Sequence, residues 1–510
     1  MNVSPASNNS LRRSIVLLAS IASLAYFCFL CFYYSSHDVM WLDEFFAWNI
    51  LSDHSLSHAI DSWQHGADSG GILYYVVGWL LLQITGPHVL VMRFFSAIAL
   101  WAASFLYWKL LSRSFSPLSA LFGVSLIWCS HELVSRVAEV RFYGFYILMA
   151  VVATYATLIA VSRPLSRPKV FLVCFCAHIG LLSSHIMGVV YSGAILVALL
   201  VGKRSKATLT AACGIVSTWP LLLLFRSAIY YGSGNATSVA MPDLVDLTSY
   251  YHLPVSHKAD ALLSLGVIAC LFIIFRRANI RRILENAPRP NLLRVSFIFF
   301  LTPLAFFLIS HLARPVFASR YMYPSWLGKA TLGALIFWAA EKNLPFRNHP
   351  LFRYGCISAV AILIIVRHAE MVFREPLRQP IDAQSLTQAA KTGGLPIISP
   401  DPETFFQLAF YQPALQTYFL TNLDSELREH PNAPHGMMQS IEQQGYWADR
   451  IEDVNRFTQE HDNFLYLDFP QQQPFRQAFL PAIKWRTESV GTVQIRSNSI
   501  SIIRFERIRH

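Results

Sequence analysis

Two adjacent carboxylates, Asp43 and Glu44, lie in the aromatic run at 41–48, directly after the first long apolar segment. A charged pair this close to a membrane is costly unless water or a substrate meets it. Helical spacing separates Asp43 and Ala47 from the aromatic side chains, which predicts a short interfacial helix. Adjacent helical residues point about 100° apart, so we expect one carboxylate to act as a base and the other to orient it or pair with a cation. A purely anchoring acidic helix is the alternative.

Further ionisable and polar side chains gather in the predicted outer loops and at the span ends beside them: Asp53, His54, His58, Asp61, His65, Asp68, His131, Glu132, Arg136, Glu139, Arg141, His185, Arg314, Arg320 and Tyr321. This density on one face favours an enzyme whose site faces outward. Plainer interpretations stay open: Glu132 and Arg136 as a helix-face ion pair, His185 as a packing residue, and Arg141 and Arg320 as snorkelling side chains. Two interfacial arginines are nevertheless what a lipid phosphate requires, because guanidinium binds phosphate through two hydrogen bonds.

The composition is that of a membrane protein. Of 510 residues 54% are hydrophobic and 14% are charged, whereas soluble proteins carry about 25% charged residues. The net charge of +11 is expected in cytoplasmic loops and is no sign of nucleic-acid binding. All eight cysteines lie in apolar segments, so neither a disulfide framework nor a metal-ligand spacing is indicated. Arg12 and Arg13 before the first apolar run predict a retained signal anchor.

Apolar runs predict about eleven spans. They cover residues 14–34, 89–111, 117–129, 141–161, 170–183, 185–201, 207–228, 259–275, 295–312, 324–340 and 354–366. With the N-terminus inside, the basic loops are cytoplasmic, and the first outer loop (35–88) and the tail lie outside. The run at 72–85 would invert every later loop if it spanned, so we expect an interfacial or re-entrant helix there.

The polar tail predicts a second unit. We divide the chain into a transmembrane domain (1–366) and a small soluble domain of α/β or α+β class (367–510). Helical signals occupy 381–391 and 402–410, the latter with Asp401 or Pro402 near its start. Strand-like runs occupy 396–399, 463–469, 490–496 and 499–507. The last two runs flank Ser497 and Asn498 and are typical of a hairpin.

Several short motifs follow one another in an order that resembles a known family. They are Asp43-Glu44, Leu73-Tyr74-Tyr75, Ile84-Thr85-Gly86 with Arg93, Glu139-x-Arg141-x-Tyr143, His185-x-x-Gly188, Arg314-Pro315-Val316-Phe317 and Arg320-Tyr321. Over roughly residues 14–420, this pattern resembles the GT-C superfamily of membrane glycosyltransferases. The nearest likeness is to the bacterial branch of the dolichyl-phosphate-mannose–protein mannosyltransferase family, which includes the lipid A aminoarabinose transferases. The His-Pro-Pro common before Leu-Tyr-Tyr is replaced here by His65-Gly66-Ala67.

The resemblance implies an inverting transfer of a sugar from a polyprenyl phosphate to a hydroxyl of a glycolipid, glycan or protein. It implies catalytic roles for Asp43 and Glu44, with Asp43 the general base and Glu44 supporting the loop. It places the donor phosphate on Arg141, Arg320 and Tyr321, supported by Glu139, His185 and Asp68. Glu139 would orient Arg141 or touch the acceptor. The setting would be a bacterial inner membrane, with site and tail periplasmic.

This chemistry is sound in itself. A lipid-phosphate leaving group needs cationic stabilisation, which arginine supplies, and an alcohol nucleophile needs a carboxylate within ~3 Å. No cofactor or metal site is indicated, although some GT-C relatives use a divalent ion. A transporter or flippase of a lipid-linked substrate, or a non-catalytic membrane scaffold, are the alternatives. The lack of internal repeats and of charges at mid-membrane depth speaks against transport.

Overall fold

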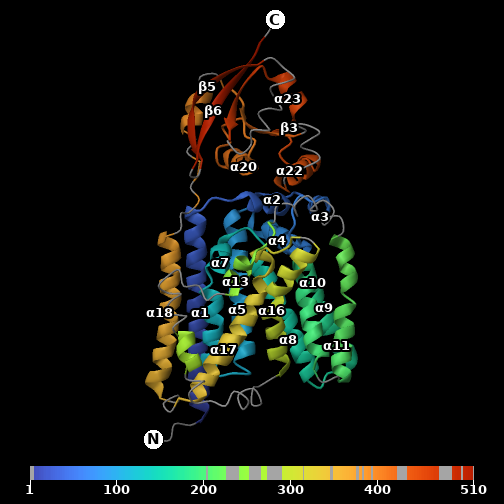
Figure 1. Ribbon diagram of the computed structural model, residues 1–510, viewed down its shortest axis with the longest axis vertical. Coiled ribbons are helices and arrows are strands. Elements are labelled where there is room, and N and C mark those ends of the chain that lie inside the picture. Colours follow the sequence, from blue (N-terminus) through green and yellow to red (C-terminus); the bar gives the residue numbers. More distant parts are fainter. Residues whose placement is uncertain are drawn as a thin grey trace.

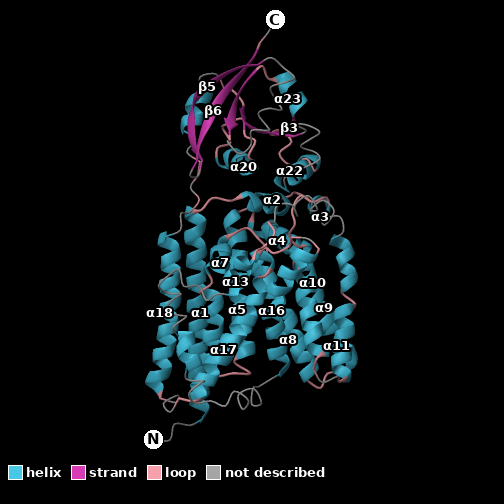
Figure 2. Ribbon diagram, in the orientation of Figure 1, coloured by secondary structure: helices cyan, strands magenta, loops and turns pink. Residues whose placement is uncertain are grey.

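The computed structural model describes residues 5–202, 205–225, 240–251, 266–272, 290–313, 315–344, 349–374, 378, 380–381, 384–391, 394–421, 433–469, 485–495 and 498–508. A helical bundle makes up most of the chain, and a small sheet domain stands on one end of it (Figures 1 and 2). Parts of the span predicted at 259–275, together with Arg314 and Ser497, lie outside the described residues.

Long helices run side by side through the bundle (Figure 1): α1 (Pro5–His37), α5 (Val89–Leu111), α6 (Pro117–Trp128), α8 (Tyr143–Ser162), α9 (Arg167–Ser184), α10 (Gly188–Leu200), α11 (Lys206–Val216), α16 (Pro290–Leu312), α17 (Trp326–Lys342) and α18 (Pro350–Arg374). Within the described ranges, five helical stretches are long and apolar enough to cross a membrane: Val89–Leu111, Tyr143–Ser162, Lys206–Phe225, Pro290–Leu312 and Leu351–Glu370. The predicted polytopic helical architecture is confirmed. Helix α18 continues past the domain boundary predicted at 366.

Small residues let neighbouring helices approach closely. A Cβ atom on Gly144 of α8 would lie 2.3 Å from the carbonyl oxygen of Ser96 on α5, and one on Gly123 of α6 would lie 2.3 Å from the carbonyl oxygen of Ala330 on α17. Such small-residue contacts are how helices associate in lipid, where apolar burial gives little driving force. They fix the spacing of the helices whose ends carry the polar side chains.

Short helices cover the end of the bundle that faces the tail: α2 (Leu42–Leu51), α3 (Leu56–Gln64), α4 (Ile72–Thr85) and α7 (His131–Ser135). The helix expected around Asp43 and Glu44 is therefore present as α2. Helix α4 packs against α2, α3, α5 and α9. Its placement in the interface stays a prediction.

The tail forms a mixed six-stranded sheet of order β3-β2-β1-β4-β6-β5. Its strands are β1 (Ile397–Ile398), β2 (Thr417–Thr421), β3 (Ile451–Asp453), β4 (Asn463–Asp468), β5 (Trp485–Ile495) and β6 (Asn498–Arg507). β1 pairs in parallel with β2 and β4, and β2 with β3, whereas β6 is antiparallel to β4 and β5. The hairpin predicted near the C-terminus is confirmed as β5–β6.

The helices of the tail are α19 (Gln384–Lys391), α20 (Pro402–Tyr411), α22 (Ala433–Gln443) and α23 (Val454–Glu460). Asp401 caps α20 as predicted, because its carboxylate accepts a hydrogen bond from the backbone N–H of Thr404 at 2.8 Å. The predicted helix at 402–410 is confirmed. Strands β2 and β3 were not predicted.

Aromatic packing joins the tail to α2. The ring of Phe406 on α20 lies 5.2 Å from that of Phe45 and 5.8 Å from that of Phe46. The indole N–H of Trp447 donates to the side-chain oxygen of Asn49 at 3.0 Å. Phe45 and Phe46 are fully buried, and burial of each such ring contributes roughly 1.5–3 kcal/mol. The aromatic side of α2 is thus covered by the tail, where the sequence predicted a membrane-interface surface.

Candidate active site

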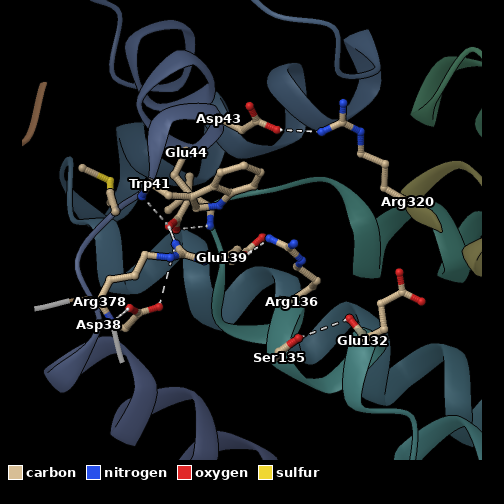
Figure 3. A network of polar contacts seen from close by, with 12 residues as sticks. Asp38, Trp41, Asp43, Glu44, Glu132, Ser135, Arg136, Glu139, Arg320 and Arg378 are labelled. Atoms are coloured by element: carbon tan, nitrogen blue, oxygen red, sulfur yellow. Dashed lines mark hydrogen bonds and ion pairs between the residues drawn. The ribbon is translucent and has the colours of Figure 1, made fainter. Parts of the chain in front are cut away.

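The first turn of α2 sends its two carboxylates in different directions. Trp41 is the N-cap, and its backbone N–H donates to Glu44 Oε2 at 3.2 Å, which holds the Glu44 side chain against the helix start. Asp43, one residue earlier, points away from Glu44 toward Arg320 (Figure 3). Two separate ion clusters form around the two acids.

The Asp43 cluster consists of Asp43, Asp68, Arg141 and Arg320. Arg320 Nη1 donates to Asp43 Oδ2 at 3.1 Å, and Arg141 Nη2 lies 3.8 Å from the same oxygen. The Asp43 side chain is 21% exposed and that of Arg320 is 36% exposed. Arg141 and Asp68 are buried. The cluster therefore presents one accessible carboxylate and one accessible guanidinium, with a buried cation behind them.

Hydrogen bonds hold the guanidinium of Arg141 in place. Its Nη1 donates to the backbone oxygen of Asp43 at 2.8 Å and to Asp68 Oδ2 at 2.7 Å. The hydroxyl of Tyr75 donates to the same oxygen of Asp68. Arg141 Nε is buried and has no hydrogen-bond partner among the described residues. Asp68 is thus the residue that orients Arg141.

His185 and Tyr321 form a wall beside this cluster. The buried His185 ring stacks on Phe142 at 4.7 Å and lies 5.5 Å from the Tyr321 ring. The Arg320 guanidinium lies 5.6 Å from the centre of the Tyr321 ring. His185 thus packs against these rings as part of the wall.

The Glu44 cluster consists of Asp38, Glu44, Arg93, Arg136, Glu139 and Arg378. Glu44 is fully buried. Its Oε1 accepts from Arg93 Nε at 3.2 Å and from the backbone N–H of Val140 at 2.7 Å, and its Oε2 accepts from Arg93 Nη2 at 3.3 Å. Glu44 thereby ties α2 to α5 and to the chain segment that precedes α8. Its oxygens are occupied by donors, an arrangement that suits a residue which positions others.

Arg378, from the chain that follows α18, completes the Glu44 cluster. Its Nη2 lies 3.3 Å from Glu139 Oε1 and its Nη1 lies 3.7 Å from Glu44 Oε2. Its backbone N–H donates to Asp38 Oδ1 at 2.8 Å. The centre of the Trp41 ring lies 5.4 Å from the guanidinium of Arg378 and 5.0 Å from that of Arg136; Figure 3 shows the three residues together.

Two predicted pairings in the second outer loop are wrong. Arg136 pairs with Glu139 at 2.8 Å and not with Glu132. The carboxylate of Glu132 points away from Arg136 (Figure 3), and Ser319 and Lys329 act on it. Glu139 belongs to the Glu44 cluster and does not orient Arg141. Burial raises the pKa of Glu139 above its ordinary value; Arg136 and Arg378 oppose the shift and Glu44 adds to it.

The histidines of the first outer loop have other partners. His58 Nδ1 lies 2.5 Å from Asp53 Oδ2, and its Nε2 lies 3.1 Å from the backbone oxygen of Gln444 in the tail. His65 pairs with Asp61 at 3.4 Å. No group of three or more His, Cys, Asp or Glu side chains suited to a metal ion occurs in the described part of the chain. Metal independence stays a prediction.

Sequence reasoning missed Arg378 and Asp38 entirely and noted Arg93 only as part of a motif. The sequence could have indicated Arg93 as part of a buried ion pair, since an arginine inside the first turns of an apolar span needs a buried partner. The sequence gives no such indication for Arg378, because it stands alone in a polar segment.

These arrangements define what the site can do. The accessible carboxylate of Asp43 can accept a proton, and the accessible guanidinium of Arg320 can bind an anionic oxygen. The two groups lie 3.1 Å apart, so a proton donor and an anion would be held next to each other.

Comparison with solved structures shows what the chain is similar to. The crystal structure of ArnT from Cupriavidus metallidurans in the apo state matches with a TM-score of 0.55 and 11% sequence identity, covering 98% of this chain and 98% of that chain. ArnT from the same organism bound to undecaprenyl phosphate matches with a TM-score of 0.53 and 12% identity, covering 96% and 97%. No protein-family model and no curated protein sequence matches. The chain thus has an ArnT-like fold along almost its whole length.

Proposed function

We propose that this protein is an inverting glycosyltransferase that moves a sugar from a polyprenyl phosphate to an acceptor hydroxyl. The observation that carries the proposal is the accessible pair of Asp43 and Arg320, 3.1 Å apart, backed by the buried Arg141. The fold supports it, because a structure with the same fold holds undecaprenyl phosphate. Membrane lipids surround the enzyme, and its substrates meet at the end of the bundle that carries α2.

In the proposed reaction the acceptor oxygen attacks the anomeric carbon of the donor sugar. Asp43 takes the hydroxyl proton as the new C–O bond forms. The bond between the anomeric carbon and the phosphate oxygen breaks, and its electron pair leaves with the polyprenyl phosphate. Attack from the face opposite the phosphate inverts the anomeric centre. The leaving group gains a negative charge, which Arg320 and Arg141 stabilise.

The charges of the Asp43 cluster explain how donor binding prepares the base. Asp43 and Asp68 balance Arg141 and Arg320, so the free cluster has no net charge. An entering phosphate competes with Asp43 for the N–H donors of the Arg320 guanidinium. Phosphate binding by Arg320 thereby loosens its 3.1 Å contact with Asp43 and leaves that carboxylate free for the acceptor. Tyr321, beneath Arg320, limits the positions that the guanidinium can take.

We further propose that the site faces the periplasm of a bacterial inner membrane. The basic loops between predicted spans lie at 109–116, 162–169, 202–206, 276–294 and 341–353, and such loops stay in the cytoplasm. Asp43 and the tail then lie on the opposite side. Transport is the weaker alternative, because the ion clusters described above lie at the end of the bundle, whereas transport sites lie near the midplane.

Mass spectrometry of glycolipids, glycans and glycoproteins from a deletion strain tests the function. A glycosylated product should disappear in the deletion strain and return with the wild-type gene, but not with Asp43→Asn. Asp61→Asn is the matched control, because Asp61 is exposed and pairs only with the exposed His65 in the ion pairs described above. A product profile that Asp43→Asn leaves unchanged at normal expression would refute the proposal.

A further inference from the structure

We propose that a cavity near the Asp43 cluster is a carbohydrate subsite that takes a hydroxyl-rich group without a negative charge; this rests on the proposed function and names the substrate chemistry of the same site. The cavity has a volume of about 380 Å³. Its walls come from α7, from the segment leading into and including α13 (Leu244–Tyr251), and from the chain around the short helix η4 (Ser319–Tyr321). The lining residues are Glu132, Ala240, Pro242, Asp246, Ser249, Tyr250, Phe317, Ser319 and Met322.

The position of the cavity relates it to the donor phosphate. Ser319 and Met322 line the cavity, while Arg320, between them in the chain, reaches Asp43. The cavity wall and the residue assigned to the phosphate are therefore neighbours in the chain. A sugar is bonded directly to its phosphate, and an acceptor sugar must reach the same anomeric carbon. Either one has to be housed near Arg320.

The lining chemistry fits hydroxyl groups and disfavours anions. Glu132 and Asp246 supply carboxylate acceptors, and Ser249 and Ser319 supply hydroxyls. Carboxylates accept hydrogen bonds from sugar hydroxyls, whereas they repel phosphate. Apolar side chains such as Phe317 complete the lining, as in sites where a few polar groups orient a ligand against an apolar wall.

Lys329, a cation beside this lining, is held away from an anion. Lys329 Nζ donates to the backbone oxygen of Tyr250 at 2.5 Å and lies 3.9 Å from the ring centres of both Tyr250 and Trp326. The ammonium group therefore interacts with a carbonyl and two aromatic faces. Glu132 stands in the wall as an acceptor; burial raises its pKa, which Ser319 and Lys329 partly offset.

Hydrogen bonds hold one wall of the cavity on the bundle. The hydroxyl of Tyr250 donates to the backbone oxygen of Met322 at 3.1 Å and also contacts the Ser325 hydroxyl. The hydroxyl of Tyr251 donates to the backbone oxygen of Phe300 on α16 at 2.9 Å. These bonds dock α13 on the bundle, so the ligand does not have to order this wall.

Two substitutions in the full-length protein test the subsite. Glu132→Gln removes an acceptor charge from the wall, and Ser249→Leu fills the cavity from an exposed helix face without disturbing the core. Thr248→Leu, the exposed neighbour outside the lining, is the control. We expect each test variant to lower the glycosylated product in the strain roughly tenfold. The Kd for undecaprenyl phosphate, the sugar-free probe, should stay within about twofold of the wild type.

Native mass spectrometry of the purified variants tells which substrate supplies the sugar. If the fraction of bound polyprenyl phosphate that carries a sugar falls, the cavity holds the donor sugar; if it stays constant while product falls, the cavity holds the acceptor. Product at wild-type level in both folded variants would overturn the proposal. A Kd for undecaprenyl phosphate raised as far as in Arg320→Ala would also overturn it, by making the cavity a phosphate site. Loss of product in Asp43→Asn separates failure of the subsite from failure of the proposed function.

Discussion

Asp43 and Glu44 are neighbours in the chain but belong to different ion clusters. Glu44 is 0% exposed, and Arg93 and two backbone N–H groups donate to its oxygens. Asp43 is 21% exposed, and its closest partner, Arg320, is itself 36% exposed. The first turn of α2 separates the two acids by about 100°. A carboxylate already bound by buried donors holds structure together, and only the other one is free to exchange a proton.

The two clusters also differ in one of their cations. In the Glu44 cluster three carboxylates face three arginines, and one of these, Arg378, comes from the chain after α18. In the Asp43 cluster both arginines come from segments at the end of the bundle, Arg141 before α8 and Arg320 before α17. The tail is therefore coupled to the site through Glu44 and Arg378, and the proposed chemistry needs only groups on the other side of α2.

The largest expected effect is on stability. Glu44→Gln leaves the guanidinium of Arg93 buried without its counter-ion, which costs about 3–5 kcal/mol of the free energy of unfolding. Thermal unfolding in detergent measures this loss, with Asp61→Asn as the exposed control. A Glu44→Gln protein that unfolds at the wild-type temperature but transfers no sugar would contradict the structural role of Glu44 and assign it a catalytic one.

Arg320→Ala should change binding and leave the fold intact. Each charge-assisted hydrogen bond contributes about 1.5–3 kcal/mol, so the Kd for undecaprenyl phosphate should rise roughly 10–100-fold. Arg320→Lys should recover part of the affinity, because lysine keeps the charge but loses the two-pronged geometry. Isothermal titration in detergent measures both. Unchanged donor affinity in Arg320→Ala would remove this residue from the phosphate site.

Arg378→Ala should destabilise the protein in a pH-dependent way. Because burial raises the pKa of Glu139 in the folded state, the folded protein holds this proton at a pH where the unfolded chain has lost it, and stability falls as pH rises through that window. Without Arg378 the ionised form loses a partner. The difference in unfolding temperature between Arg378→Ala and wild type should therefore be larger at pH 8 than at pH 5. A pH-independent difference, like that expected for the exposed Arg456→Ala, would contradict the coupling.

The smallest expected effect concerns donor affinity in Asp43→Asn. Removing the carboxylate frees Arg320 from its 3.1 Å ion pair, so undecaprenyl phosphate should bind a few-fold more tightly than to the wild type. Titration of the two proteins under equal ionic strength measures this. Weaker binding would mean that Asp43 does not compete with the phosphate for Arg320.

Local pattern was enough for much of the fold. The apolar runs placed the bundle helices, Asp401 marked the start of α20, and alternating residues marked β4 and the β5–β6 hairpin. The order of short motifs pointed to the fold that the ArnT structures share. Strand β3 was not predicted because three residues are too few to show an alternating pattern. Strands β2 and β3 depend on parallel pairing within the tail, which leaves no signature within one segment.

The site was less predictable than the fold. Asp43 and Arg320 stood out because each is a charged residue at a span end. The Glu44 cluster joins residues far apart in the chain: Val140 bonds Glu44 across 96 residues and Arg378 bonds Glu139 across 239. Helical spacing favoured Glu132 for Arg136, but the chain turns at Arg136 into a short 3-10 helix and brings Glu139 to it instead. Such choices depend on packing that no local window contains.

The rate of sugar transfer by purified Asp43→Asn, measured beside its unfolding temperature, tests the central claim most directly. With Asp43 as the general base, the rate should fall about 10²–10⁴-fold, and the unfolding temperature should stay at the wild-type value because both members of the Asp43–Arg320 pair are accessible. A rate close to that of the wild type in a folded Asp43→Asn protein would contradict the assignment of the base.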